Sequence, residues 1–496
     1  MRGQAGGEAV DVCVVGAGAA GLYASLCAAR AGARVTLLSA MPLAQTASYW
    51  AQGGLAAVLT ADDSAELHLA DTERAGRGAV RTSAARVLVD EAPACVRDLE
   101  ALGFRFDADR RGRLALGLEG GHSLRRIVHA GGSATGRRLL RVLSALVVEH
   151  ERVRVIEGAR MSGLLVGDGR CHGVGYSTNG DAEAHTILTR ASILSTGGAA
   201  ALWGRTTNPP GSIGQGLLLA HRAGAELADL ELMQFHPTAV IGVAGREGFL
   251  ITEAIRGEGA TLHDRDGERF VDELAPRDEV SRAIWERLRQ SGESAVALDM
   301  RAIDPALFPN VIGALREAGL DPTRELVPVA PAAHYTIGGV VCDLHGRTGV
   351  DGLYAVGETA CTGLHGANRL ASNSLSECFV FGRRAALAAL DEPTASGAEI
   401  ATPAASALPA AIAAVSEQTR QALWRHAGIE RLQSGLNELL EDPHPLARMV
   451  GRCALLRQET RGTHSRSDYP ERDEKLDRQH AVIPTGTEMP DWQGWQ

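Results

Sequence analysis

A short apolar run followed by a glycine-rich turn constrains the fold of this chain more than any other feature. Val10–Val15 reads VDVCVV, which suits a buried parallel strand, and GAGAAG follows at Gly16–Gly21. An alanine- and leucine-rich stretch of helical character, Leu22–Ala31, comes next, and Arg34–Ser39 reads as a second strand. A strand, a glycine turn, a helix and a strand form a βαβ unit. The sequence therefore predicts an α/β domain of the Rossmann type.

The glycine turn also predicts a ligand. GAGAAG fits G-x-G-x-x-G, whose glycines allow a tight turn and close approach of the backbone, while the helix N-terminus faces a pyrophosphate. The motif alone is weak, and a purely structural glycine turn is the alternative. Its place between a strand and a helix favours dinucleotide binding. The turn residues expected to contact the dinucleotide are Gly16, Gly18, Ala19, Ala20 and Gly21.

The flanking residues favour FAD over NAD. An NAD site usually places an acid about 20 residues after the turn, at the end of the second strand, whereas this chain has Ser39 followed by Ala40. A hydroxyl or the backbone must then hold the ribose. TASYWAQGG (46–54) adds hydroxyls and a glycine pair, and GLYAVGE ends in Glu358, which could bind a ribityl hydroxyl. The alternative for Glu358 is a surface acid.

The composition excludes several classes of protein. A formal net charge of −10 argues against nucleic acid and membrane surfaces as partners. The sequence has no apolar run of about 18 residues and no signal-peptide pattern. Its eight cysteines form no CxxC pair, so we expect no metal site, and their place in apolar runs suggests thiols in a reducing compartment. We expect a cytoplasmic protein without membrane attachment.

The length of 496 residues is too great for a single core, so about two or three domains are expected. The pattern of a short apolar strand followed by a glycine turn, typical of the first domain, is interrupted in the middle of the chain and recurs at GLYAVGE. This interruption indicates an inserted domain. A stretch rich in alanine, proline and serine at 392–416 predicts a linker, with helical periodicity and a polar tail after it. We predict an FAD-binding domain in two parts, 1–230 and 334–400, an inserted domain at 231–333 and a C-terminal domain at 401–496.

A set of segments, in order and over nearly the whole chain, resembles the succinate dehydrogenase/fumarate reductase flavoprotein superfamily, and within it the L-aspartate oxidases. The segments are GAGAAG, YWAQGGLAAV, EGGHSLRRIVHA, QFHPTA, TEAIRGEGA, LAPRD, HYTIGGV, GLYAVGE and GLHGANRLASNSLSEC. The resemblance implies an α/β FAD-binding Rossmann-like domain, an inserted α+β capping domain and a C-terminal helical domain. The substrate is expected between the first two.

The resemblance also implies a reaction. FAD would oxidise L-aspartate to iminoaspartate, and the electrons would pass to oxygen, giving hydrogen peroxide, or to fumarate, giving succinate. This would be the first step of NAD biosynthesis through quinolinate. Because iminoaspartate is unstable in water, a transient contact with quinolinate synthase is plausible.

A four-carbon dicarboxylate needs a cation or a hydrogen-bond donor at each end. Arg369 offers a planar fork for bidentate binding of a carboxylate. His236 and His334 can donate hydrogen bonds, as can the Thr252 hydroxyl. Gln234 lies two residues before His236, so on a strand it would share that face. A lone histidine is more often structural, but the motif context of both histidines favours substrate binding.

Arg277, in LAPRD, matches the arginine that the superfamily uses for proton transfer. Free arginine is a poor base because its pKa exceeds about 12, so this role requires a tuned pocket and a relay. Glu253 and Arg256 are three residues apart in TEAIR and could form that relay with Arg277. A plain surface ion-pair ladder is the alternative. The segment VDE between Phe270 and LAPRD is shorter than expected, which leaves the reach of Arg277 open.

Glu119, in LEGGHSLRR, is an acid in a site that should bind acids. Aspartate, unlike succinate and fumarate, carries an ammonium group beside the carbon that loses hydride. A glutamate there would pair with the ammonium, contributing about 1.5–3 kcal/mol. The resemblance assigns this role to Glu119, with His122 and Arg126 supporting the loop or the flavin. The alternative is a loop acid paired with Arg125 or Arg126.

Two positions bear on how FAD is held. The superfamily members that bind FAD covalently use a histidine where this chain has Ala47, so non-covalent FAD is expected. Gln215 replaces an aspartate that is usual in its loop, which could weaken a flavin contact. The further FAD contacts expected are Ser39, Ser48, Gln52, Gly53, Gly54, Glu358, Ser372, Ser374 and Leu375.

Two other functions remain open at this point. A soluble fumarate reductase or succinate dehydrogenase flavoprotein is the nearer alternative, against which Glu119 and Ala47 argue. A flavin-binding interaction protein without turnover is the second alternative, and the complete set of candidate catalytic residues argues against it.

Overall fold

The structure is a computed structural model that describes residues 10–179, 184–393 and 414–496. The predicted linker at 392–416 lies almost entirely outside the described residues. Among the described residues, no helix is long and apolar enough to cross a membrane.

The predicted βαβ unit forms the centre of a seven-stranded sheet in the described part of the chain. β1 (Val10–Val15) pairs in parallel with β2 (Val35–Ser39) on one side and β9 (His185–Leu194) on the other. α1 (Ala19–Arg30) connects β1 to β2. The other strands of this sheet are β6 (Val153–Glu157), β7 (Ala159–Gly167), β8 (Arg170–Thr178) and β16 (Leu353–Ala355).

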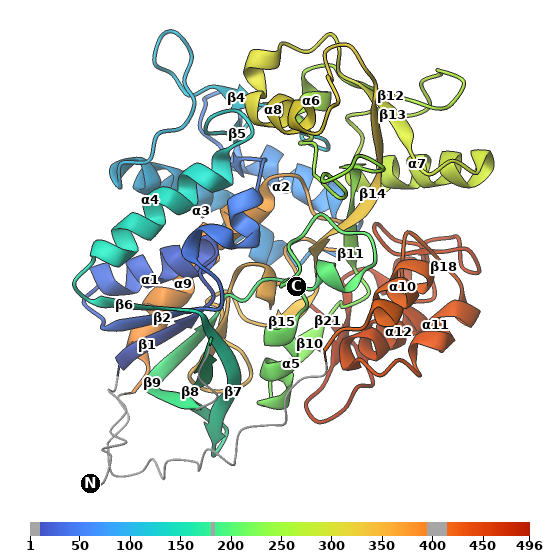
Figure 1. Cartoon of the computed structure of the whole chain (residues 1–496). Helices are drawn as coiled ribbons and strands as arrows, with labels where there is room; N and C mark the ends of the chain where they lie inside the picture. Colours follow the sequence, from blue (N-terminus) through green and yellow to red (C-terminus); the bar gives the residue numbers. More distant parts are fainter. Residues whose placement is uncertain (1–9, 180–183, 394–413) are drawn as a thin grey trace.

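Helices cover one side of this sheet. α1 packs against α9 (Asn373–Ala388) and α4 (Thr135–Glu149), and α3 (Thr82–Ala101) packs against α9 and against α2 (Ala65–Ala75). Figure 1 shows α1, α4 and α9 together on that side. Because β16 and α9 come from the second part of the predicted FAD-binding domain, the two parts share one core around Ala191, Ile193 and Tyr354.

The inserted segment forms a second body with its own core. An antiparallel sheet contains β11 (Met233–Val240), β14 (Val327–Thr336), β13 (Val296–Asp299) and β12 (Thr261–His263) in that order. Its helices are α6 (Ala254–Gly257), α7 (Arg277–Ser291) and α8 (Pro309–Glu317). Figure 1 shows these elements, coloured from green to yellow, above the central sheet. We call this body the cap.

The C-terminal segment is helical only in part. α10 (Glu417–His426), α11 (Gln433–Leu439) and α12 (Pro445–Leu456) pack together, with the short parallel pair β18 (Glu430–Arg431) and β19 (Ser465–Arg466) beside them. The polar tail then forms β20 (Gln479–Ile483) and β21 (Asp491–Gly494). These strands extend a sheet that also contains β10 (Leu227–Ala228), β15 (Gly339–Val341) and β17 (Ala360–Cys361).

Two smaller elements complete the surroundings of the site. β3 (Leu55–Ala56), β5 (Ile127–Val128) and β4 (Leu116–Gly117) form a small antiparallel sheet. α5 (Gln215–Arg222) begins after Gly214, whose left-handed backbone (φ 69°) turns the chain into the helix.

Candidate active site

A cavity of about 680 Å³ lies between the cap and the helix-covered sheet. Its walls come from the glycine turn after β1, the end of β2, residues 45–54, residues 207–213 and the start of α9. The cap adds His236, Thr252, Glu253 and Arg277. The cavity therefore joins segments that are far apart in the sequence.

The glycine turn lies at the cavity as predicted, with one exception. Gly16, Gly18, Ala19 and Ala20 line the cavity at the N-terminus of α1, where the positive end of the helix dipole favours an anion. Gly21 does not line the cavity. A Cβ at Gly21 would lie 1.9 Å from the Gly16 carbonyl oxygen, so this glycine serves the packing of helix on strand instead of touching a ligand.

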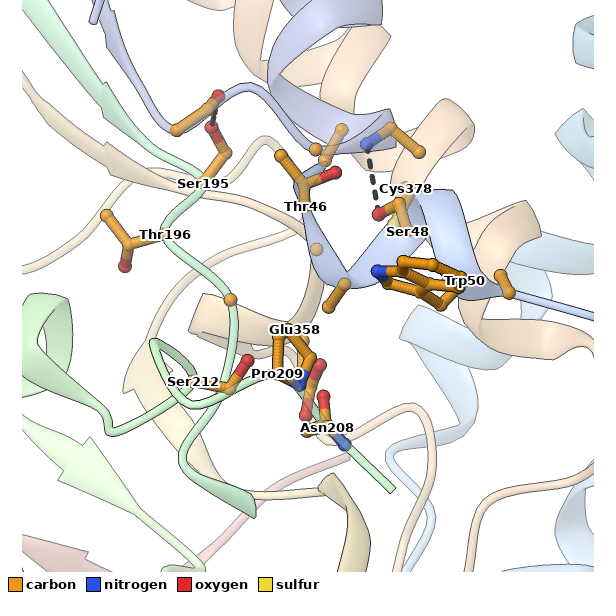
Figure 2. A pocket seen from close by; sticks show the side chains of 18 of the residues that line it. Thr46, Ser48, Trp50, Ser195, Thr196, Asn208, Pro209, Ser212, Glu358 and Cys378 are labelled. Atoms are coloured by element: carbon orange, nitrogen blue, oxygen red, sulfur yellow. Dashed lines mark hydrogen bonds between the residues drawn. The ribbon is translucent and has the colours of Figure 1, made fainter. Parts of the chain in front are cut away.

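Three polar side chains line the cavity near this turn. Ser48 accepts a hydrogen bond from the Ala19 N–H at 3.2 Å (Figure 2). Ser39 lines the cavity, and its hydroxyl donates to the Met41 carbonyl at 2.5 Å. Gln215 also lines the cavity, at the start of α5, and its amide donates to the Met161 carbonyl at 3.3 Å.

Glu358 faces the cavity, so the alternative of a surface acid is wrong. It lies beside Asn208 and Pro209 in Figure 2, and it accepts a hydrogen bond from the Thr336 N–H at 2.9 Å. Burial raises the pKa of Glu358 to about 7. A carboxyl group with a raised pKa is available to hydrogen-bond a hydroxyl of a bound ligand.

Gln52 connects the two bodies. Its amide donates to the Leu250 carbonyl at 2.6 Å, and its carbonyl accepts from the Thr252 N–H at 3.2 Å. Gly53 and Gly54 follow it and line the cavity. The predicted FAD contact Gln52 therefore also holds the cap segment that carries Thr252.

The other end of the cavity is cationic. Arg277, Arg369, His236, His334 and Thr252 all line it, as predicted for a dicarboxylate site. Burial, and then the nearby charge of Arg277, lower the pKa of the Arg369 guanidinium to about 10. Arg369 also stacks on the ring of Tyr335, with its Cζ 4.5 Å from the ring centroid, and donates to Ser374 at 2.8 Å.

Gln234 does not line the cavity, which corrects its prediction as a substrate contact. Its carbonyl oxygen accepts from Arg277 Nη1 and from Arg369 Nε, both at 3.1 Å. The two guanidinium groups thus lie between the amide and the cavity. Gln234 shares the side of β11 that faces the site but positions the two arginines from behind.

The two histidines lie close together, with ring centroids 5.1 Å apart. Burial and the charge of Arg277 hold the pKa of each well below its ordinary value, so both rings are neutral. The Thr238 N–H donates to Nδ1 of His236, which leaves the ring hydrogen on Nε2 as a donor. The pairing of β14 with β11 skips His334, and this bulge turns the His334 ring toward the cavity.

Arg277, Glu253 and Arg256 form the predicted row of ion pairs. Arg277 Nε donates to Glu253 at 2.7 Å, and Arg256 lies 3.1 Å from the other oxygen of that carboxylate. Arg256 itself does not line the cavity and donates to the Glu273 carbonyl deeper in the cap. These groups are buried, so the alternative of a surface ladder is wrong. The short VDE segment still places Arg277 at the cavity, as the first residue of α7.

Glu119 lines the cavity and is 2% exposed. Ser372 donates to one carboxylate oxygen at 2.6 Å, and His129 Nε2 lies 3.2 Å from the other. Burial raises the pKa of Glu119, but the hydrogen bonds with His129 and Ser372 outweigh burial and lower this pKa to about 2. The Glu119 carboxylate is therefore ionised and faces a cavity that also contains Arg277 and Arg369.

The alternative partners of Glu119 are engaged elsewhere. Arg125 lies 3.5 Å from Glu258, and Arg126 pairs with Asp63 and Asp71 at 2.9 and 2.6 Å. His122, from the same segment, lies with Nε2 2.9 Å from the Ala371 carbonyl. His122 thus contacts the segment that carries Ser372, which is consistent with the predicted supporting role of His122.

Sequence reasoning missed His129 and Tyr335. His129 comes directly after the two-residue strand β5, which has no recognisable pattern of its own. Tyr335 follows His334 in HYTIGGV, but its role depends on the Arg369 guanidinium that stacks on its ring, and the sequence does not show that contact. Among the described residues, no group of three or more histidine, cysteine or acidic side chains could hold a metal ion.

Comparison with known proteins identifies the family. Residues 11–375 match the FAD binding domain family, and residues 440–492 match the fumarate reductase flavoprotein C-terminal family. The L-aspartate oxidase of Agrobacterium fabrum is 43% identical, covering 95% of this chain and 93% of that protein. The L-aspartate oxidase of Mycobacterium tuberculosis is also 43% identical, over 95% and 94%.

Solved structures agree in fold. A quinol-fumarate reductase has a TM-score of 0.88 at 27% identity and covers 98% of each chain. Sdh1 of Mycobacterium smegmatis has a TM-score of 0.83 at 29% identity, covering 99% of this chain and 95% of its own. The cavity residues described above fit FAD, and the chain belongs to the L-aspartate oxidase family of FAD-dependent flavoproteins.

Proposed function

We propose that the protein oxidises L-aspartate to iminoaspartate, with oxygen or fumarate as electron acceptor, as the first step of NAD biosynthesis through quinolinate. The observation that carries the proposal is the ionised Glu119 in a cavity whose lining also includes Arg277, Arg369 and two histidines, while the Glu253 carboxylate there is already paired with Arg277. A dicarboxylate without an amine would gain nothing from that carboxylate. The ammonium group of an amino dicarboxylate would form an ion pair with the Glu119 carboxylate, which would contribute about 1.5–3 kcal/mol to binding.

Different cavity residues bind the two carboxylates of the substrate. Arg369 and His334 bind one carboxylate, and His236 with Thr252 binds the other. Gln234 fixes the two guanidinium groups in place from behind. Because both histidines are neutral, each donates a hydrogen bond without adding a charge that would hold the product.

Oxidation removes a hydride from Cα and one proton from the ammonium group. FAD, held by the residues named below, would supply the redox chemistry of this oxidation. With fumarate, the chain must instead supply a proton to carbon, and Arg277 is the group at the cavity that transfers it. Glu253 and Arg256 then return the proton to Arg277 along their row of ion pairs. Free arginine is a weak acid, so this row is what makes Arg277 effective.

FAD is held without a covalent bond. Ala47 lines the cavity at the position where a histidine would make that bond, and its methyl side chain offers no nitrogen. The FAD contacts in this proposal are Gly16, Gly18, Ala19, Ala20, Ser39, Ser48, Gln52, Gly53, Gly54, Glu358, Ser372, Ser374 and Leu375.

The setting of the reaction follows from chemistry. All eight cysteines are free and lie in the described part of the chain, which favours a reducing cytoplasm. The imine product hydrolyses in water, which favours its direct transfer to quinolinate synthase during a transient contact.

Steady-state turnover tests the proposal. The purified holoenzyme should produce hydrogen peroxide from L-aspartate, and much less from D-aspartate, L-glutamate or succinate. Peroxide from succinate without peroxide from L-aspartate would instead identify a succinate-oxidising flavoprotein. Failure to bind FAD and turn over any of these acids would favour a non-catalytic protein.

A further inference from the structure

The two oxygens of the Glu119 carboxylate have one hydrogen-bond partner each among the described residues. Ser372 donates to Oε2 at 2.6 Å, and His129 Nε2 lies 3.2 Å from Oε1. The partners come from separate parts of the fold, since His129 follows β5 and Ser372 precedes α9. The carboxylate is therefore held at both oxygens while its cavity side stays open.

The two partners are not equivalent. The Ser372 hydroxyl also accepts a hydrogen bond from the Gly54 N–H at 3.1 Å, so it is tied to the backbone near the flavin segment. His129, which follows β5, does not line the cavity. Removing Ser372 would disturb a predicted FAD contact, whereas removing His129 changes the acid alone.

We propose that His129 is a positioning residue that makes the site selective for amino dicarboxylates over dicarboxylates without an amine. It donates from Nε2 to Glu119 and so keeps this buried side chain an ionised, correctly turned carboxylate. The inference rests on the proposed function, because it concerns how the same site recognises the substrate ammonium group.

The surrounding backbone makes room for this contact. Gly117 in β4 pairs with Ile127 in β5, and a Cβ at Gly117 would lie 2.5 Å from Cε1 of His129. On the cavity side, a Cβ at Gly53 would lie 3.6 Å from Oε1 of Glu119. Glycine at position 117 therefore leaves space for the imidazole, whereas the 3.6 Å at Gly53 is an ordinary van der Waals distance.

Without the Nε2 donor, one oxygen of Glu119 would be buried and unpaired. Burial then favours the protonated acid, which cannot form an ion pair with an ammonium group. Ligands that carry only carboxylates do not use Glu119 and would bind as before. The loss should therefore appear with L-aspartate and not with succinate.

Variants of the holoenzyme test this inference. In His129→Leu, the KM for L-aspartate should rise at least about tenfold, while the inhibition constant of succinate stays within about threefold of the parent value. His129→Gln, whose amide nitrogen reaches the place of Nε2, should restore most of the preference. Gly117→Ala, which pushes the imidazole away, should reproduce the selectivity loss of His129→Leu.

The outcomes separate the inference from the proposed function. A parent enzyme that does not oxidise L-aspartate would end the proposed function itself. With an active parent, equal weakening of L-aspartate and succinate, or no change of either, would overturn the role of His129. Failure of His129→Gln to restore any preference would also overturn it, because a donor would then be irrelevant. If His129→Leu does not retain FAD, the KM for L-aspartate and the inhibition constant of succinate are compared in Gly117→Ala instead, with the same expected outcomes.

Discussion

The Glu253 carboxylate lies between two arginines, 2.7 Å from Arg277 Nε and 3.1 Å from Arg256 Nη2. Arg277 touches the cavity, and Arg256 lies behind it, within the cap. Burial lowers the pKa of Arg256 from its ordinary value. A row with a less basic inner member can exchange protons more readily than an isolated arginine at the surface.

Replacing Arg277 tests its role in proton transfer. Arg277→Leu should lower kcat for fumarate reduction by about 10³-fold, because Arg277 supplies the proton to carbon in that reaction and general acid–base groups contribute about 10²–10⁴-fold. FAD should stay bound, since Arg277 lies on the cap side. Turnover and the flavin absorbance of the same sample are the measurements.

A surface arginine of the same helix is the matched control. Arg289 pairs with Glu286 at the exposed end of α7, so Arg289→Leu should keep kcat within about twofold. Comparable losses in both variants would show that α7 as a whole, and not the Arg277 side chain, is required.

The charge of Glu119 can be removed with almost no change of shape. Glu119→Gln should lower kcat/KM for L-aspartate oxidation by at least about tenfold, because the ion pair with the ammonium group is lost. Reduction of fumarate by the reduced enzyme should largely survive, since fumarate has no amine. Equal loss of both activities would mean that Glu119 serves folding or flavin placement.

Site residues could be predicted from the sequence where a short segment alone imposes the structural requirement. A tight turn before a helix needs glycine at fixed places, so GAGAAG marked both the βαβ unit and one end of the cavity. Glu358 and Arg369 were likewise found through the short segments around them. The structure confirms that these residues share one cavity.

The sequence could not show whether a candidate residue lines the cavity or lies behind its wall. That distinction depends on which side chains from other segments pack in front of it. Gln234 and Arg256 lie one layer behind, covered by side chains from other segments. The strands β20 and β21 were missed for a related reason. Their partner β10 lies some 250 residues earlier in the chain, as the pairing of Ala228 with Val482 shows.

Ser372 combines a strained backbone with a functional hydroxyl. Its φ of 61° is left-handed, which costs an L-residue about 1–2 kcal/mol. Ser372→Gly should therefore be more stable to urea than Ser372→Ala by about 1 kcal/mol. Both variants lose the donor to Glu119, so both should weaken L-aspartate binding to a similar degree. Equal stabilities would show that the backbone relaxes once the hydroxyl is gone.

Gly21 should be required for folding around FAD even though it does not face the cavity. A Cβ there would lie 1.9 Å from the Gly16 oxygen and 2.4 Å from Ser195 Oγ, so Gly21→Ala must move the turn. We expect a loss of about 3 kcal/mol in stability, with a lower FAD content. Gly313→Ala in α8, where a Cβ meets no described atom within 4 Å, should instead stabilise by about 0.5–1 kcal/mol. Thermal unfolding and flavin content distinguish the two.

Glu358 should make the stability of the FAD-free protein depend on pH. Burial raises its pKa from 4.5 to about 7, so the folded chain binds this proton more tightly than the unfolded chain. The stabilisation is complete below about pH 4.5 and is lost as the pH rises toward 7. The difference amounts to about 3 kcal/mol at most. Glu358→Gln removes the titration, so its unfolding temperature relative to the parent should rise between pH 5 and pH 8. A difference that is the same at both pH values would show that Glu358 ionises normally in the folded protein.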